Sequence, residues 1–259
     1  MAHTLNTPVM LKYSMPDGSL AAEMVRLSGG TFTRVDDAGE LVSEVEVSEF
    51  TMGRYVVTFE QYDRFAKATG RKLPGACGWG RSSRPIMKVS WFDATAYAQW
   101  LSEVTGEYFR LPTEAEWEHA CRAGTKTDYS FGEKLTKEQA NFDRTNSKTM
   151  PVGSYQPNPF GLYEMHGNVW EWCSDWYDKY PTGKVKDPKG PVGGKYRVLR
   201  GGSWFVNAGL TRSTSRACDE PGERDHSRGF RLAGRSAATK LRSTRVRSGH
   251  APQVVSSDG

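Results

Sequence analysis

The sequence has no long apolar run, no paired cysteines and little net charge outside its last residues, and each absence excludes a class of protein. No apolar stretch in the 259 residues approaches the roughly 20 residues of a membrane helix, so no membrane span is expected. Residues 1–13 lack the charged and then apolar pattern of a secretory leader. The default expectation is therefore a cytoplasmic protein, with export by another route left open.

The cysteines are few and widely spaced, and the sequence contains no CxxC pair. No histidine stands where it would complete a zinc knuckle, so structural zinc is not expected. The net charge of +5 comes mainly from residues 234–259, in which Arg and Lys outnumber acids. Because the rest of the chain is close to neutral, this pattern predicts a basic, disordered tail and no nucleic-acid partner.

Glycine and tryptophan are abundant, with 27 and 8 residues, whereas hydrophobic residues make up only 37%. This balance indicates a loop-rich fold held by aromatic side chains and hydrogen bonds. The stretch GLYEMHGNVWEWCSDWY, residues 161–177, is the clearest case. Its predicted core residues are Trp170, Trp172 and Trp176. A carboxylate beside them needs a cation, either calcium or one of three arginines: Arg200, Arg216 or Arg231.

Two main helices and a short third one are predicted in the first half of the chain. The first follows Thr58 as N-cap, stops at Gly70 and has an apolar face formed by Phe59, Tyr62, Phe65 and Ala66. The second ends at Gly106 and has an apolar face formed by Ala94, Tyr97, Ala98 and Leu101. The third follows Thr113, where Glu116 completes a capping box.

Short strands are predicted from alternating apolar and polar residues within 24–32, 43–58, 195–202 and 229–233. Much of the chain after residue 125 is predicted to form turns, because Gly, Pro, Asn and Asp recur every few residues. No internal repeat or linker interrupts the pattern. The sequence therefore predicts one α+β domain over residues 24–233, preceded by a lead-in (1–23) and followed by the tail (234–259).

Three motifs carry a family resemblance: RLPTEAEWEHACRAG, FGLYEMHGNVWEWCSDWY, and RVLRGGSWF followed by GFRLA. In order and spacing they resemble the formylglycine-generating enzyme family, also called the sulfatase-modifying-factor domain. The resemblance covers about residues 24–233. It implies a variant of the C-type-lectin fold that is loop-rich, with two main helices and short antiparallel strands.

The resemblance also implies a structural calcium site, built in this chain by Glu164, Gly167, Val169 and Glu171. The two acids would bind through carboxylates and the other two residues through backbone carbonyls, which are ligands that suit Ca²⁺. The alternative for Glu171 is an ion pair with an arginine. A second family site would need an acid at position 153, where this chain has Gly153, so a second calcium ion is not expected.

Redox metals are not expected on the same comparison. Copper-dependent members of the family bind the metal through two cysteines shortly after the GGS turn, because soft thiolates hold Cu(I). Val206 stands at the first position, and no cysteine follows until Cys218. Another branch of the fold binds iron through three histidines of an added helical domain, whereas the histidines here are scattered and form no HxxxH pattern.

Between the anchors RGGSW and GFRLA lies a polar segment without hydrophobic period, residues 205–227. This layout resembles the variable proteins of diversity-generating retroelements, in which the corresponding stretch is the mutable ligand-binding face. The residues expected to face a ligand are Trp204, Phe205, Val206, Asn207, Leu210, Ser215, Ala217, Asp219, Asp225, His226 and Ser227. Three arginines are expected to brace the scaffold instead: Arg212, Arg216 and Arg231.

These features together predict a non-catalytic protein that binds a protein or another macromolecule through residues 205–227. The alternative is an oxidoreductase of the same family that works without the cysteine pair, in a pocket beside Trp204 and Glu171. A third reading is a domain that assists another enzyme or a signalling complex.

Overall fold

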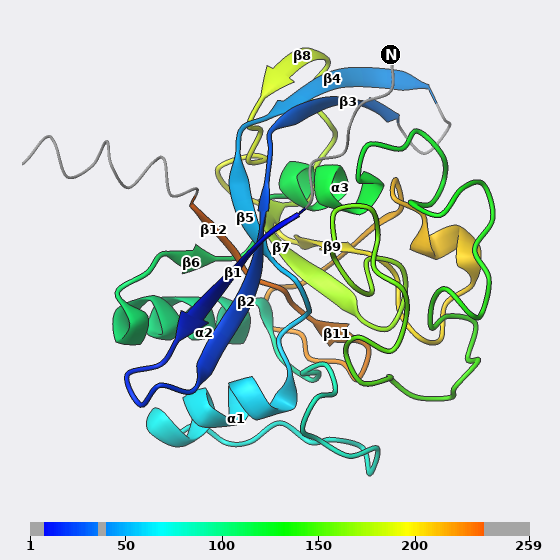
Figure 1. Cartoon of the computed structure of the whole chain (residues 1–259). Helices are drawn as coiled ribbons and strands as arrows, with labels where there is room; N and C mark the ends of the chain where they lie inside the picture. The colour runs from blue at the N-terminus through cyan, green and yellow to red at the C-terminus, as the bar shows by residue number, and fades with distance from the viewer. Residues whose placement is uncertain (1–7, 36–39, 236–259) are drawn as a thin grey trace, which may run out of the picture.

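The computed structural model describes residues 8–35 and 40–235, which form three small sheets and three α-helices (Figure 1). The first sheet has the order β1 (Val9–Ser14), β2 (Leu20–Leu27), β5 (Phe50–Gly53), β12 (Ala233–Arg235), β6 (Phe109–Arg110). The second has the order β10 (Arg216–Asp219), β9 (Arg197–Arg200), β7 (Trp170–Trp176), β11 (Arg228–Gly229). The third has the order β3 (Gly30–Val35), β4 (Leu41–Val47), β8 (Gly183–Lys186).

The sheets are mostly antiparallel, as the resemblance implies, but two strand pairs are parallel. β4 pairs in parallel with β8, and β7 pairs in parallel with β11. Strand β12, the last in the described chain, lies between β5 and β6 and is antiparallel to both. The two ends of the domain are thus tied into one sheet.

Two helices begin after the N-caps predicted for them, Thr58 and Thr113, and the remaining helix begins after Ser90, which the sequence analysis did not single out. α1 (Phe59–Ala68), α2 (Trp91–Thr105) and α3 (Glu114–Arg122) each open with a capping box, on Thr58, Ser90 and Thr113 respectively. The predicted apolar faces of α1 and α2 are buried. α2 ends at Gly106, whose φ of 69° is left-handed backbone that glycine adopts without strain. No helix in the described residues is long and apolar enough to cross a membrane.

Several strands differ from the sequence prediction. β1 and the start of β2 lie within residues 1–23, so the folded domain begins earlier than the expected lead-in allows. β7 was expected to be a loop-like stretch. β12 continues to Arg235, two residues into the expected tail, and residues 236–259 lie outside the described chain. Of the predicted strand at 229–233, only the two ends pair, in β11 and β12.

A buried ion pair between Glu171 and Arg231 lies in the core beside Trp172 and Trp117, which are fully buried. The Glu171 carboxylate accepts hydrogen bonds from Arg231 Nε at 2.6 Å and Nη2 at 2.7 Å, and from the Trp117 indole at 2.7 Å. Arg231 also donates to the carbonyls of Gly53 and Tyr163. The arginine expected to neutralise Glu171 is therefore Arg231, and it joins β7 to the end of β5.

Replacing Arg231 by Met should lower the free energy of unfolding by about 3–5 kcal/mol, because the Glu171 carboxylate stays buried without a cation. Urea denaturation followed by tryptophan fluorescence measures this. The control is Lys186→Met, which breaks a solvent-exposed pair with Glu46 and should cost far less than the loss of the buried pair. Equal losses in the two variants would contradict the structural role of the buried pair.

Candidate ligand-binding patch and metal site

Three aromatic rings surround the imidazole of His226. The imidazole stacks on Phe205, with centroids 6.0 Å apart and planes 2° apart, and meets Trp204 at 5.5 Å and Trp79 at 5.9 Å. Trp79 and Trp204 also contact each other edge to face at 5.3 Å. Asp225 holds the imidazole by a 3.0 Å contact to Nδ1. These five residues, Trp79, Trp204, Phe205, Asp225 and His226, are called the aromatic patch below.

The backbone beneath the patch is fixed by hydrogen bonds to distant segments. The N–H of Trp204 donates to the carbonyl of Asn168 at 3.0 Å, and its own carbonyl accepts from Arg144. The carbonyl of Val206 accepts from Asp143 at 2.7 Å. Since these bonds tie the segment to Asn168 and to the turn at residues 143–144, the patch sits on a fixed base rather than on a free loop.

The polar end of the patch is an ionised carboxylate. Burial raises the pKa of Asp225, but hydrogen bonds from Ser227 and His226 outweigh this and hold it below its ordinary value. Both the N–H and the hydroxyl of Ser227 donate to Asp225 Oδ1. Trp204, which was expected to face a ligand, is instead buried at 9% exposure, and its indole N–H has no partner in the described chain. The patch therefore presents the rings of Trp79, Phe205 and His226 beside one negative charge.

The remaining residues expected to face a ligand divide by role. Ala217 and Asp219 lie on β10, and Asp219 forms an ion pair with Arg228. Leu210 is 45% exposed on the short 3₁₀ helix η1 (Ala208–Thr211). Two side chains serve the turn itself: Asn207 caps η1, and the Ser215 hydroxyl donates to the carbonyl of Gly209.

Ser227 is only 2% exposed, so it positions Asp225 rather than facing a ligand itself. Trp79 was missed by the sequence analysis because it lies far from residues 205–227 along the chain. The available signal was a tryptophan between Gly78 and Gly80, both with positive φ, in an otherwise polar connection. Of the three bracing arginines, Arg216 and Arg231 pair with buried glutamates, whereas Arg212 pairs with Asp128 at the surface.

The expected calcium ligands divide into two environments. Both oxygens of Glu171 are engaged by Arg231 and Trp117, which corresponds to the arginine alternative. Glu164 is buried, with a positive φ of 50°, and accepts hydrogen bonds from the backbone N–H of Gly153 at 2.9 and 3.2 Å. Its carboxylate forms no ion pair within the described residues.

A cavity of about 10 Å³, the size of one water or cation, lies beside Glu164. Its lining includes the side-chain amides of Gln139, Gln156 and Asn158. Asn158 Oδ1 already accepts from the backbone N–H groups of Phe160 and Leu162, and Gln139 Oε1 accepts from that of Thr136. The structure thus fits a cation on Glu164 better than one on Glu171. Calcium itself stays a prediction, with Glu164 as its charged ligand, and neither Gly167 nor Val169, the other expected contributors, lines this cavity.

The cysteines are unbridged and do not gather into a metal site. Val206 lies in the position expected for a copper thiolate, and Cys218 lies on β10. Burial raises the pKa of the Cys121 thiol to about 12 and that of the Cys173 thiol well above its ordinary value. His166 contacts Cys121 but its pKa is lowered by burial to about 4, so this pair stays neutral at physiological pH.

Comparison with known proteins now identifies the fold family. The family model described as the sulfatase-modifying factor enzyme 1-like domain matches residues 13–236. The chain belongs to this family. The formylglycine-generating enzyme of Streptomyces coelicolor is 33% identical over 81% of this chain and 88% of its own length. The serine/threonine-protein kinase pkn1 of Chlamydia caviae is 37% identical over 83% of this chain, but the match spans only 38% of the kinase.

Solved structures agree with the family. Treponema denticola variable protein 1 superposes with a TM-score of 0.76 and 29% identity, covering 89% of this chain and 100% of that one. PvdO from Pseudomonas aeruginosa gives a TM-score of 0.75 and 31% identity over 87% of this chain and 98% of its own. The predicted α+β, loop-rich fold of the formylglycine-generating-enzyme type is confirmed.

The stability of the domain should fall as pH rises through the range in which Glu164 ionises. Burial raises the pKa of this carboxyl to about 7, so between its ordinary pKa and about 7 the unfolded chain loses the proton first. Glu164→Gln should remove that loss and gain up to about 3 kcal/mol relative to the natural chain at about pH 8. Denaturant titrations across this range measure it.

The control for this pH series is Glu223→Gln, which changes an exposed carboxyl. Burial, followed by the charge of Glu114, raises the pKa of Asp175 to about 7. Asp175 therefore adds a similar loss of stability with rising pH, and this loss remains in every variant. Parallel pH curves for Glu164→Gln and the natural chain would contradict the assignment.

Calcium should raise the melting temperature, and more so at about pH 8 than at about pH 5.5, because it binds the ionised Glu164 carboxylate. We expect a rise of about 5 °C or more with calcium in large excess over its Kd. Glu164→Gln should abolish the rise, and magnesium at the same concentration serves as the control. Identical melting curves in calcium and in chelator would exclude the site.

Proposed function

We propose that the chain is a non-catalytic binding protein of the retroelement variable-protein type, which recognises a protein or another macromolecule. The binding surface is the aromatic patch with Ala217 and Asp219 of β10, and the observation that carries the proposal is the cluster of three rings, Trp79, Trp204 and Phe205, around His226. The chemistry is recognition: apolar rings bury area, while Asp225 and His226 supply directional polar contacts.

The patch has the composition of an interface centre. Tryptophan and other large aromatic side chains dominate the binding energy of protein interfaces when they become fully desolvated. Phe205 and His226 are half-buried in the free chain, so a partner can cover the rest of their surface without a change of fold. The Asp225 carboxylate then requires a hydrogen-bond donor or a cation on the ligand.

The backbone that carries the patch is held by contacts that do not depend on the patch side chains. Arg200 is fully buried and donates to the carbonyls of Ser213, Thr214 and Ser215, which fixes the middle of the segment through backbone atoms alone. Side chains at Phe205, Ala217 and His226 therefore do not determine the path of the chain. Such a segment keeps its shape when these side chains change.

The relatives support this proposal at two levels. Variable protein 1 of Treponema denticola shares the fold over nearly the whole described chain. The Chlamydia kinases contain a related domain as about two fifths of their length, which is consistent with a recognition module that also occurs inside longer proteins. Formylglycine generation is a weaker candidate, because Val206 replaces the first copper thiolate and the buried thiols have raised pKa values.

Phe205→Ala and His226→Ala should each weaken binding of a selected ligand by about tenfold or more. The ligand is obtained by selecting a displayed library of folded domains against the natural chain, and the Kd of each variant is then measured by interferometry. Val192→Ala, an exposed apolar side chain outside the patch, is the matched control and should leave the Kd unchanged.

The same variants should change the free energy of unfolding by less than about 1 kcal/mol. Loss of folding in Phe205→Ala and His226→Ala, or an unchanged Kd in both, would refute the patch. Copper-dependent conversion of a sulfatase-derived cysteine peptide to the aldehyde, detected by mass spectrometry, would refute the non-catalytic part of the proposal.

A further inference from the structure

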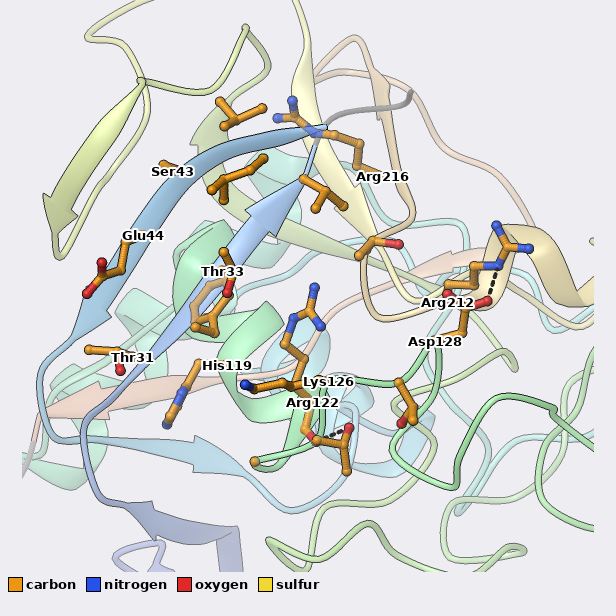
Figure 2. Close-up of a pocket in the computed structure, with 18 of the residues that line it drawn as sticks. Thr31, Thr33, Ser43, Glu44, His119, Arg122, Lys126, Asp128, Arg212 and Arg216 are labelled. Atoms are coloured by element: carbon orange, nitrogen blue, oxygen red, sulfur yellow. Dashed lines mark hydrogen bonds and ion pairs between the residues drawn. The ribbon is translucent and has the colours of Figure 1, made fainter. Parts of the chain in front are cut away.

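A larger cavity lies on another part of the molecule, outside the aromatic patch. It has a volume of about 880 Å³ and is bounded by β3 and β4, the end of α3, the turn at 124–128 and residues 212–216 (Figure 2). This volume is in the range of sites that hold a small organic ligand. None of the five patch residues lines it.

The walls of the cavity are basic. Among the residues that the structure describes, five basic side chains line it, Arg122, Lys126, Lys184, Arg212 and Arg216, against the acids Asp128 and Glu44, of which Glu44 pairs with Lys184. His119 also lines it, but burial lowers the pKa of its imidazole and keeps it uncharged at neutral pH. Hydroxyl-bearing residues, among them Thr31, Thr33 and Thr214, add to the polar lining.

The guanidinium groups of Arg122 and Arg216 are each held by a buried glutamate. Arg122 donates through Nε and Nη2 to Glu118, at 3.0 and 2.9 Å, and packs over the ring of Phe32. Arg216 is held in the same way by the buried Glu114. Because these guanidinium groups are already oriented, a ligand would not bear the entropy cost of ordering them.

Lys126 differs from the other cations. It is exposed at the cavity, and its ammonium forms no ion pair with any residue that the structure describes. Figure 2 shows Lys126 and Arg122 between β3 and the Arg212–Asp128 pair. That pair is half-exposed, with side chains 48% and 40% accessible, so it is weak and its guanidinium can turn toward a ligand.

We infer that this cavity binds a small anionic ligand carrying at least two phosphate or carboxylate groups, with Lys126 and Arg122 on one group and Arg212 on another. The threonine hydroxyls of β3 donate to the same ligand, and fixed arginines with a free lysine suit oxyanions. This site is distinct from the aromatic patch, and of residues 205–227 only Arg212, Thr214, Ser215 and Arg216 line it.

The test uses pyrophosphate and citrate as probes, measured by calorimetry on the full chain. Each probe isolates one oxyanion class, and maltose serves as a neutral ligand of comparable size. Lys126→Ala should raise the Kd of the binding probe about tenfold, and Lys126→Glu should raise it further. The matched control is Lys137→Ala, an exposed lysine outside the cavity, which should change the Kd less than about twofold. The Kd should also increase with salt.

Binding of pyrophosphate alone identifies a phosphate ligand, and binding of citrate alone identifies a carboxylate ligand. Absence of binding by both probes at about 1 mM, or equal Kd values for Lys126→Ala and Lys137→Ala, overturns the inference. Thermal unfolding of every variant establishes that Lys126→Ala remains folded. Binding of the selected macromolecular ligand by Lys126→Ala should be unchanged, which separates failure of this site from failure of the aromatic patch.

Discussion

Buried ion pairs hold this fold together where its short strands cannot. Glu171 and Arg231 are both fully buried and join the second sheet to the end of β5, while Glu118 and Arg200 join α3 to β9. A buried pair is costly to desolvate, so its worth depends on complete hydrogen bonding. Glu171 is bonded through both oxygens. Arg200 donates to three backbone carbonyls besides its carboxylate, and only its Nε is left without a partner among the described residues.

These pairs explain how a loop-rich chain can present a fixed surface. The sheets are small, and the chain between α3 and β7 contains no helix or long strand within the described residues. The hydrogen bonds of Arg200 and of the Trp204 and Val206 backbone hold this part of the chain in place of regular strand pairing. Both the aromatic patch and the basic cavity therefore border the same braced segment, one at each end of η1.

Local sequence signals predicted the helices well because capping is a local interaction. Thr58 and Thr113 are bonded to residues three positions on, and both helices start where those residues indicate. β7 was missed because Trp170, Glu171 and Trp172 are all buried, so the strand lacks the alternation by which half-exposed strands are recognised. Trp79 was missed for a different reason, since its contact with His226 exists only in the folded chain.

Within residues 204–227, the side chains differ in how much of the structure depends on them. Asn207 caps η1, Ser215 closes the turn, and Ser227 orients Asp225, so these three are bound to the scaffold by their own hydrogen bonds. Phe205 and His226 instead contact other rings and leave part of their surface to solvent. On the proposed function, the segment can therefore change at Phe205 and His226 with little cost to folding, while the capping and bracing residues limit the remaining positions.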